Sequence, residues 1–281
     1  MTQPVYLRPA RVEDALGALA GHHFSVLAGG TDFYPDRVGR LIREDILDIS
    51  ALSALRGVTR EEQAWRIGAL TTWRGLVDTP LPPVFDGLKL AAREVGGMQI
   101  QNTATVAGNL CNASPAADGM PPLMALSAEV ELASAQARRR VPLTDFVTGN
   151  RRTARRPDEL ATAVLVPHHG HRARSSFLKL GSRRYLVISI VMVAVTLDVD
   201  EDGMIMRAAV AVGACAPVAR RIPVLEARLA GRPLSGDLAE LARPSDLSVL
   251  APISDIRGSA QYRLDAAFTL VRRALQEAGR E

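Results

Sequence analysis

The spacing of apolar residues changes several times along this chain, and each change predicts an element of secondary structure. Residues 5–7 alternate like an extended strand, and residues 13–20 place apolar side chains at helical intervals. Helical spacing returns at 84–95 and stops at the glycine pair 96–97, a common helix end. Short apolar runs that favour strands lie at 25–28, 45–49, 64–69 and 161–166.

Beyond about residue 172 the pattern changes character. Three strand-like runs predict an antiparallel meander, with a turn at 200–203; they are 176–180, 187–197 and 207–212. After Pro217 the helical spacing returns, which predicts helices packed on that sheet at 224–229, 238–242 and 262–278. We therefore predict one domain at 1–172, with subdomains at about 1–57 and 58–172, and a second domain at 173–281.

The composition is that of a folded globular protein. It is 47% hydrophobic and only 4% aromatic, so the core must rest on Ala, Val, Leu and Ile. No apolar run reaches the roughly 18 residues of a membrane helix, and the longest candidate, 186–197, contains Ser189 and Thr196. The N-terminus shows no secretory signal. We expect a cytoplasmic protein with no membrane span.

Charge and metal-ligand content narrow the function further. The net charge of +4 comes from clusters of arginine, which solvated loops, anion contacts or an interface explain better than nucleic acid, because no binding motif accompanies them. The two cysteines, Cys111 and Cys215, are too few for a zinc or iron-sulfur site. His168, His169 and His171 are interpreted as a polar interdomain loop, so we expect no metal site.

Two segments of small residues carry the chemistry. Residues 28–32 read AGGTD and follow a predicted strand, and residues 103–118 read TATVAGNLCNASPAAD. A bound pyrophosphate needs backbone N–H donors with no side chain in the way, together with uncharged hydroxyl donors. Both segments, interpreted as loops, fit that need. Neither is a phosphate-binding P-loop or a GxGxxG fingerprint, so an ordinary Rossmann site is not predicted.

These motifs give the chain a specific resemblance. Residues 28–32 and 105–109 resemble the two FAD pyrophosphate motifs of the flavoprotein medium subunits of the xanthine dehydrogenase and carbon monoxide dehydrogenase family of molybdenum hydroxylases. The segment 114–118 extends the second match. Further matches follow at 158–160 and at 177–179, so the resemblance covers most of the chain.

The resemblance implies an α+β fold. Its first part would be a vanillyl-alcohol-oxidase-type (PCMH-type) FAD-binding domain of two subdomains. A C-terminal domain like that of the carbon monoxide dehydrogenase flavoprotein would follow, with a three-stranded antiparallel sheet and helices.

The resemblance also assigns roles to residues, none of them catalytic. Ser114 and Asp118 would contact the ribityl chain or phosphate, with a hydroxyl the better partner for the Asp118 carboxylate. Leu160 or Ala161 would lie against the isoalloxazine ring, and Lys179 near its polar edge. Ala107 stands where many relatives have glycine, which requires a negative φ. Pyrophosphate contacts are implied for Ala28, Gly29, Gly30, Thr31, Asp32, Thr105, Ala107, Gly108 and Asn109.

The implied function is electron transfer through FAD. A large partner with a molybdenum cofactor would oxidise an organic substrate, and a small iron-sulfur partner would relay the electrons to FAD on this chain. NAD, oxygen or another carrier would receive them. Two alternatives stay open: a free-standing FAD-dependent oxidoreductase acting directly on a small organic substrate, and a non-catalytic assembly protein.

Overall fold

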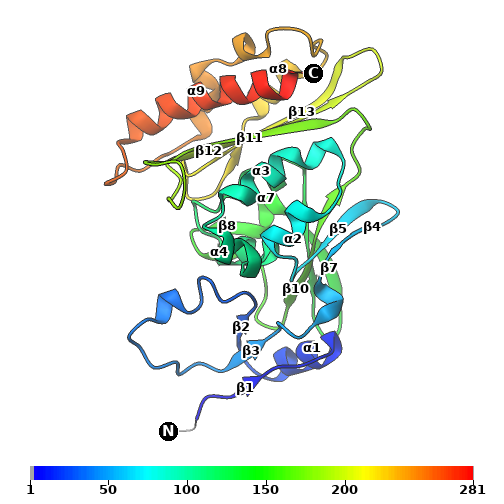
Figure 1. Ribbon diagram of the computed structural model, residues 1–281, viewed down its shortest axis with the longest axis vertical. Coiled ribbons are helices and arrows are strands. Elements are labelled where there is room, and N and C mark those ends of the chain that lie inside the picture. Colours follow the sequence, from blue (N-terminus) through cyan, green and yellow to red (C-terminus); the bar gives the residue numbers. More distant parts are fainter. Residues whose placement is uncertain (1–2, 281) are drawn as a thin grey trace.

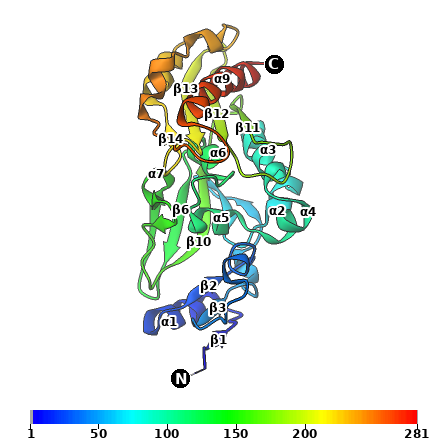
Figure 2. The same ribbon diagram turned by 90° about the vertical axis from the view of Figure 1, so that its left-hand side faces the viewer.

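The computed structural model describes residues 3–280 and stacks three units along its long axis (Figures 1 and 2). The N-terminal unit lies at one end, a larger unit with an antiparallel sheet lies in the middle, and the C-terminal sheet with its covering helices forms the other end. None of the helices in residues 3–280 is long and apolar enough to cross a membrane.

The N-terminal unit is a small parallel sheet with strand order β1-β3-β2, covered by one helix. The helix buries Ala15, Leu16 and Leu19, the apolar positions that its sequence repeats at helical spacing. The elements are β1 (Tyr6–Leu7), α1 (Val12–Gly21), β2 (Ser25–Leu27), the 3-10 helix η1 (Pro35–Arg37), β3 (Ile46–Asp48) and the 3-10 helix η2 (Ser53–Leu55).

The middle unit is a five-stranded antiparallel sheet with strand order β4-β5-β10-β6-β7. Its central strand β10 pairs along both edges and is buried over nearly its whole length, which explains its uninterrupted apolar sequence. The elements are β4 (Val58–Arg60), β5 (Ala64–Gly68), α2 (Trp73–Asp78), η3 (Pro83–Phe85), α3 (Asp86–Glu94), α4 (Met98–Thr103), α5 (Val106–Asn112), α6 (Met120–Ala125), β6 (Glu129–Ala133), β7 (Arg138–Pro142), α7 (Leu143–Phe146), the ribbon strands β8 (Val147–Gly149) and β9 (Arg152–Thr153), and β10 (Leu160–Pro167).

The C-terminal unit is an antiparallel sheet with strand order β11-β12-β13-β14. Three long strands form the predicted three-stranded sheet, and the two-residue β14 adds a short edge. The elements are β11 (Arg174–Leu180), β12 (Val191–Val199), β13 (Ile205–Gly213), β14 (Arg220–Arg221), α8 (Pro223–Leu229), η4 (Leu238–Leu241), η5 (Pro244–Val249) and α9 (Ala260–Gly279).

Side chains of different size face the two sides of the C-terminal sheet. In β12, Val193 and Val195 join the core under α8 and α9, whereas Ala194 between them belongs to the core shared with the middle unit. In β13, Val210 and Ala211 divide in the same way. Successive strand residues point to opposite faces, so the alanines in the middle of β12 and β13 let this part of the sheet approach the middle unit closely.

Backbone atoms meet where these two units pack. The Ser175 hydroxyl of β11 donates to the Val84 carbonyl at 2.6 Å and accepts from the Gly87 N–H at 2.8 Å. A Cβ on Gly87 would lie 2.9 Å from the Ser176 carbonyl oxygen, closer than a side chain tolerates. Glycine at the start of α3 therefore permits the contact between the units.

The predicted α+β architecture is confirmed, but one local prediction is wrong. The segment 105–109, interpreted as a loop, is the N-terminal part of α5. Strand β4 was also not predicted, because only three residues form it and two of them are exposed. The predicted domain boundary near residue 172 lies between β10 and β11, and it stays a prediction.

Candidate functional site

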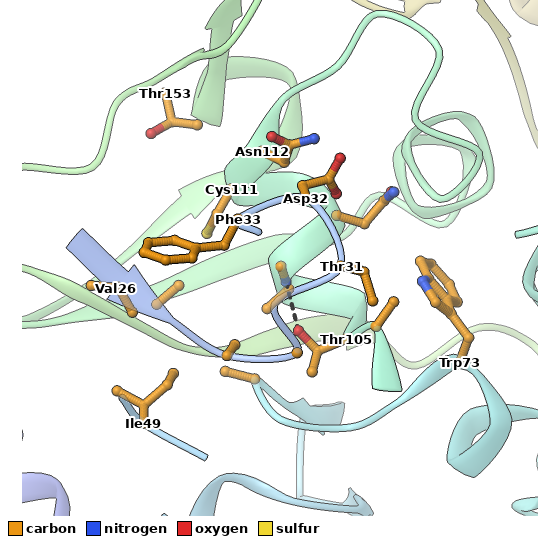
Figure 3. Close-up of a pocket in the computed structure, with 18 of the residues that line it drawn as sticks. Val26, Thr31, Asp32, Phe33, Ile49, Trp73, Thr105, Cys111, Asn112 and Thr153 are labelled. Carbon is orange, nitrogen blue, oxygen red and sulfur yellow. Dashed lines mark hydrogen bonds between the residues drawn. The ribbon is translucent and has the colours of Figure 1, made fainter. Parts of the chain in front are cut away.

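A cavity of about 590 Å³ is lined by residues of the N-terminal and middle units (Figure 3). Both small-residue segments reach it, together with the first residues of β10. Ten of the residues predicted to hold a cofactor line this cavity, namely Ala28, Gly29, Thr31, Asp32, Thr105, Ala107, Gly108, Asn109, Leu160 and Ala161. The fold thus joins segments that lie more than a hundred residues apart in the sequence.

The first segment turns directly after β2, and two glycines allow that turn. A Cβ on Gly29 would lie 2.2 Å from the carbonyl oxygen of Thr103, so only glycine lets this loop touch the second segment. Gly30 has φ +72°, a conformation that other residues rarely adopt. The Tyr34 N–H donates to the Gly30 carbonyl at 3.1 Å and closes the turn.

The second segment is a helix N-terminus rather than a loop. Thr105 is the N-cap of α5, and its hydroxyl accepts from the Gly108 N–H at 3.0 Å. The Val106 N–H donates to the Thr71 carbonyl at 2.9 Å. Ala107 lies inside the helix, so the requirement for a negative φ is met. The segment was wrongly interpreted as a loop because glycine and asparagine have low helix propensity. Burial of Val106, Ala107 and Leu110 compensates for that low propensity.

Gly108 is restricted by its own cap. A Cβ there would lie 2.7 Å from the Thr105 hydroxyl oxygen. A side chain at this position would therefore disturb the N-cap as well as narrow the cavity. The Gly108 N–H already donates to the Thr105 hydroxyl oxygen. The hydrogen of that hydroxyl stays available, so Thr105 can still donate to a ligand in the cavity.

Leu160 and Ala161 are held in place by an ion pair just before β10. Glu159 is buried and accepts two hydrogen bonds from the Arg139 guanidinium, at 2.6 and 2.8 Å, and one from the Arg156 N–H at 2.7 Å. These bonds hold the pKa of the Glu159 carboxyl below its usual value. The pair anchors the chain where Leu160 and Ala161 enter the cavity wall.

Four predicted residues are not among those that line the cavity: Gly30, Ser114, Asp118 and Lys179. Lys179 and Asp118 form a nearly buried ion pair, in which the Lys179 ammonium lies 2.8 Å from the carboxylate. Ser189 donates to the other carboxylate oxygen at 2.7 Å. Burial raises the pKa of the Asp118 carboxyl in spite of these partners. The flavin contacts expected of these residues therefore stay predictions.

Three arginines that the motifs did not single out line the same cavity: Arg37, Arg151 and Arg155. Arg151 donates to Asn112 at 2.8 Å and to Asp36 at 3.1 Å, and Arg37 lies over the Phe33 ring at 3.8 Å from its centroid. The clustering of arginine was visible in the sequence, with anion contact as one explanation. Which arginines face a cavity depends on the tertiary structure.

Trp73 also lines the cavity. It is fully buried, but its indole N–H has no hydrogen-bond partner among residues 3–280. Cys111 lines the cavity as well, and burial raises the pKa of its thiol to about 11, which keeps it protonated and unreactive at neutral pH.

The histidine cluster is not arranged as a metal site. His169 places Nδ1 at 3.1 Å from both carboxylate oxygens of Asp198, and Nε2 at 3.2 Å from the Leu126 carbonyl oxygen. This links the C-terminal sheet to the middle unit. Within residues 3–280 no group of three or more His, Cys, Asp or Glu side chains could hold a metal ion.

The cavity fits a long anionic cofactor with an apolar end, as FAD is. Glycine at position 29 lets the first segment pack against the Thr103 carbonyl, so that both small-residue segments reach the cavity wall. Neutral donors and guanidinium groups on its walls suit phosphate oxygens. Buried Leu160 and Ala161 offer an apolar surface for an aromatic ring. The Trp73 indole N–H has no hydrogen-bond partner among residues 3–280, which is a further sign that this space receives a polar ligand.

Comparison with known proteins matches both parts of the chain to families. Residues 1–169 match the FAD binding domain in molybdopterin dehydrogenase, and residues 176–278 match the CO dehydrogenase flavoprotein C-terminal domain. These matches cover nearly the whole chain.

Individual relatives show the same pattern over full length. The chain is 31% identical to the xanthine dehydrogenase FAD-binding subunit of Escherichia coli O157:H7, covering 97% of this chain and 95% of that protein. It is 30% identical to the nicotinate dehydrogenase FAD-subunit of Eubacterium barkeri, covering 93% and 91%. Among solved structures, carbon monoxide dehydrogenase from Hydrogenophaga pseudoflava, lacking the Mo-pyranopterin moiety, aligns with a TM-score of 0.88 at 26% identity, covering 99% and 97% of the two chains.

Proposed function

The chain belongs to the family of FAD-binding medium subunits of the xanthine and carbon monoxide dehydrogenases, and we propose that it passes electrons from a partner's iron-sulfur clusters through FAD to an external acceptor. It is thus an FAD-binding component of an oxidoreductase. The observation that carries the proposal is the convergence of both small-residue segments on one cavity whose walls suit FAD.

In this proposal the chain binds and orients its cofactor and leaves bond breaking to its partners. FAD supplies the ability to take electrons singly and release them in pairs. Thr31 and Thr105 offer uncharged donors to the diphosphate, and Arg151 and Arg155 balance its charge. Leu160 and Ala161 support the isoalloxazine ring, at the positions that the Glu159 ion pair fixes.

The names of the relatives support the proposal of partner subunits. Several are named as one subunit of a larger enzyme, such as the nicotine 6-hydroxylase medium subunit of Paenarthrobacter nicotinovorans. We propose that a small iron-sulfur subunit and a large molybdenum-cofactor subunit complete this enzyme too. NAD, oxygen or another carrier would be the acceptor. The large subunit would select the organic substrate, because nothing in the cavity suggests a substrate acid-base pair.

The composition of the native complex tests the partner assignment. The chain, tagged at one terminus, would be purified from cells that also express the proposed iron-sulfur and molybdenum-cofactor subunits. The amounts of FAD, iron and molybdenum per chain would then be measured. We expect about one FAD per chain together with iron-sulfur absorbance and molybdenum. A colourless, stoichiometric complex would favour the assembly-protein alternative, and flavin without iron or molybdenum would favour a free-standing oxidoreductase.

Substrate-dependent reduction tests the electron route. The complex would be screened anaerobically with xanthine, nicotinate, glyceraldehyde and carbon monoxide, and any compound that bleaches its flavin absorbance would then be mixed with the lone FAD-loaded chain. We expect the flavin of the lone chain to stay oxidised until the partner subunits are added. Rapid bleaching of the lone chain by the same compound would show that it oxidises substrate directly.

A further inference from the structure

Trp73 stands at the start of α2, where several backbone contacts fix its position. Thr72 is the N-cap of α2, and its hydroxyl accepts from the Gly75 N–H at 3.1 Å. The backbone N–H of Trp73 donates to the Ala104 carbonyl at 3.2 Å, within the second small-residue segment. The side chain is 0% exposed. The indole ring therefore has little freedom to move away from the cavity that it lines.

Packing on the far side of the ring fixes its orientation. A Cβ on Gly119 would lie 2.5 Å from the Cη2 atom of Trp73, so the six-membered ring rests against the Gly119 backbone. The Gly119 N–H in turn donates to the Asn109 side-chain oxygen at 3.3 Å. Figure 3 shows the indole nitrogen on the side of the ring that is turned toward Thr31. The nitrogen thus lies on the cavity side of the ring, where the wall covers it, while the carbon edge faces Gly119.

The indole N–H is a donor without a partner among the described residues. Among residues 3–280 no atom accepts a hydrogen bond from Trp73 Nε1, although that nitrogen is buried. Native proteins pair nearly all such groups, with protein, water or a ligand. Because the indole N–H can only donate, its partner must be an acceptor atom that enters the cavity.

The neighbours of Trp73 are also uncharged donors. The Asn109 oxygen is engaged by Gly119, which leaves its amide hydrogens for another partner. The Thr105 oxygen is engaged by Gly108, which leaves the hydroxyl hydrogen. Thr31 adds a further hydroxyl. A group of neutral donors suits a chain of oxygen atoms better than it suits an aromatic ring.

We propose that Trp73 Nε1 donates a hydrogen bond to an oxygen of the diphosphate–ribityl stretch of FAD, which makes Trp73 a cofactor-binding residue as well as a core residue. This inference rests on the proposed position of FAD in the cavity. It assigns the unpartnered N–H to a specific acceptor class. The phosphate and ribityl oxygens share that chemistry, and the experiment below separates them.

The two tryptophans of the chain allow a matched test. Trp65 lies on β5 and packs edge-to-face on Phe85 and His168, away from the residues that line the cavity. In a Trp65→Phe variant the only indole N–H resonance belongs to Trp73. Adding FAD to the full, FAD-free chain should move that resonance downfield and slow the exchange of the indole hydrogen with solvent. An ADP titration that moves it as well would assign the acceptor to the diphosphate, and a response to FAD alone would assign it to the ribityl chain.

The affinity for FAD gives a second measurement. Trp73→Phe keeps an aromatic ring but removes the N–H, and we expect FAD to bind about tenfold more weakly, as loss of one hydrogen bond implies. Trp65→Phe should bind FAD like the unchanged chain. A purely structural role would lower the melting temperature of the FAD-free Trp73→Phe protein without changing its FAD affinity.

Failure of this inference can be told apart from failure of the cavity assignment. If FAD leaves the Trp73 resonance unmoved, or Trp73→Phe binds FAD as tightly as the unchanged chain, the hydrogen bond does not exist. Loss of FAD binding in Gly29→Ala would then show that the cavity assignment still stands. If Gly29→Ala binds FAD normally, FAD lies elsewhere and both proposals fall.

Discussion

The C-terminal unit and the two units that form the cavity use small residues in different ways. In the C-terminal sheet, alanines alternate with valines, so that one face packs under helices and the other approaches the middle unit. Around the cavity, the segments 28–32 and 105–109 are rich in glycine, alanine and threonine, and most of their residues line the space between them. Alternation stabilises a sheet from both sides, whereas a run of small residues leaves the backbone open to a ligand.

The comparison also shows where the two parts depend on each other. On β11, Ser175, Phe177 and Lys179 point to the middle unit, and the residues between them point to the helices of the C-terminal unit. Lys179 is the charged member of this row, and it meets Asp118 of the middle unit. The position expected to serve the flavin therefore also joins the units.

Loss of the ion pair between the units should have the largest effect on stability. Lys179→Met would leave Asp118 buried with Ser189 alone, and we expect the free energy of unfolding to fall by about 3 kcal/mol. Lys89 is the matched control, because its ammonium donates only to the Thr79 carbonyl. Lys89→Met should cost about 1 kcal/mol. Equal losses in urea denaturation of the two variants would show that the pair does not join the units.

The next largest effect should come from adding a side chain at Gly29, where the two small-residue segments touch. Gly29→Ala places a methyl group against the Thr103 carbonyl oxygen, and we expect a loss of about 1–3 kcal/mol from this overpacking, together with loss of bound flavin. Gly17→Ala is the control, since nothing lies within 4 Å of a Cβ there and the position is inside α1. That variant should keep its flavin and be slightly more stable. A yellow Gly29→Ala protein with unchanged stability would contradict this account of the cavity.

The smallest effect should be a pH-dependent one confined to the C-terminal unit. The Arg257 N–H and the Arg263 guanidinium lower the pKa of Asp255 from 3.8 to about 2. A carboxyl with a lowered folded-state pKa adds stability above its unfolded pKa and loses it as the pH falls through the folded value. Asp255→Asn should therefore lower the melting temperature near neutral pH, and the difference should shrink from about pH 4 to about pH 2. A difference that stays constant over this range would rule out the ionic contribution.

The sequence predicted the strands of the C-terminal sheet because they are apolar runs, and β12 and β13 are buried along most of their nine residues. Their bounds were less exact, since the predicted strand 187–197 begins four residues before β12. Helix α5 was missed because its seven residues include Gly108 and Asn109, and its stability depends on contacts outside the helix. One such contact is the hydrogen bond from Val106 to Thr71. A local pattern cannot report a partner that lies far away in the sequence.

The sequence by itself identified two stretches of low bulk, because 28–32 and 105–109 are rich in glycine, alanine and threonine wherever those stretches lie in the fold. Their match to known motifs was sufficient to predict FAD. The tertiary structure alone decided which side chains surround that backbone. It brought Arg151 to the cavity, left the indole N–H of Trp73 without a partner among residues 3–280, and paired Lys179 with Asp118. Such contacts depend on how sheets and helices pack between residues far apart in the sequence. The local spacing of residues does not encode that packing.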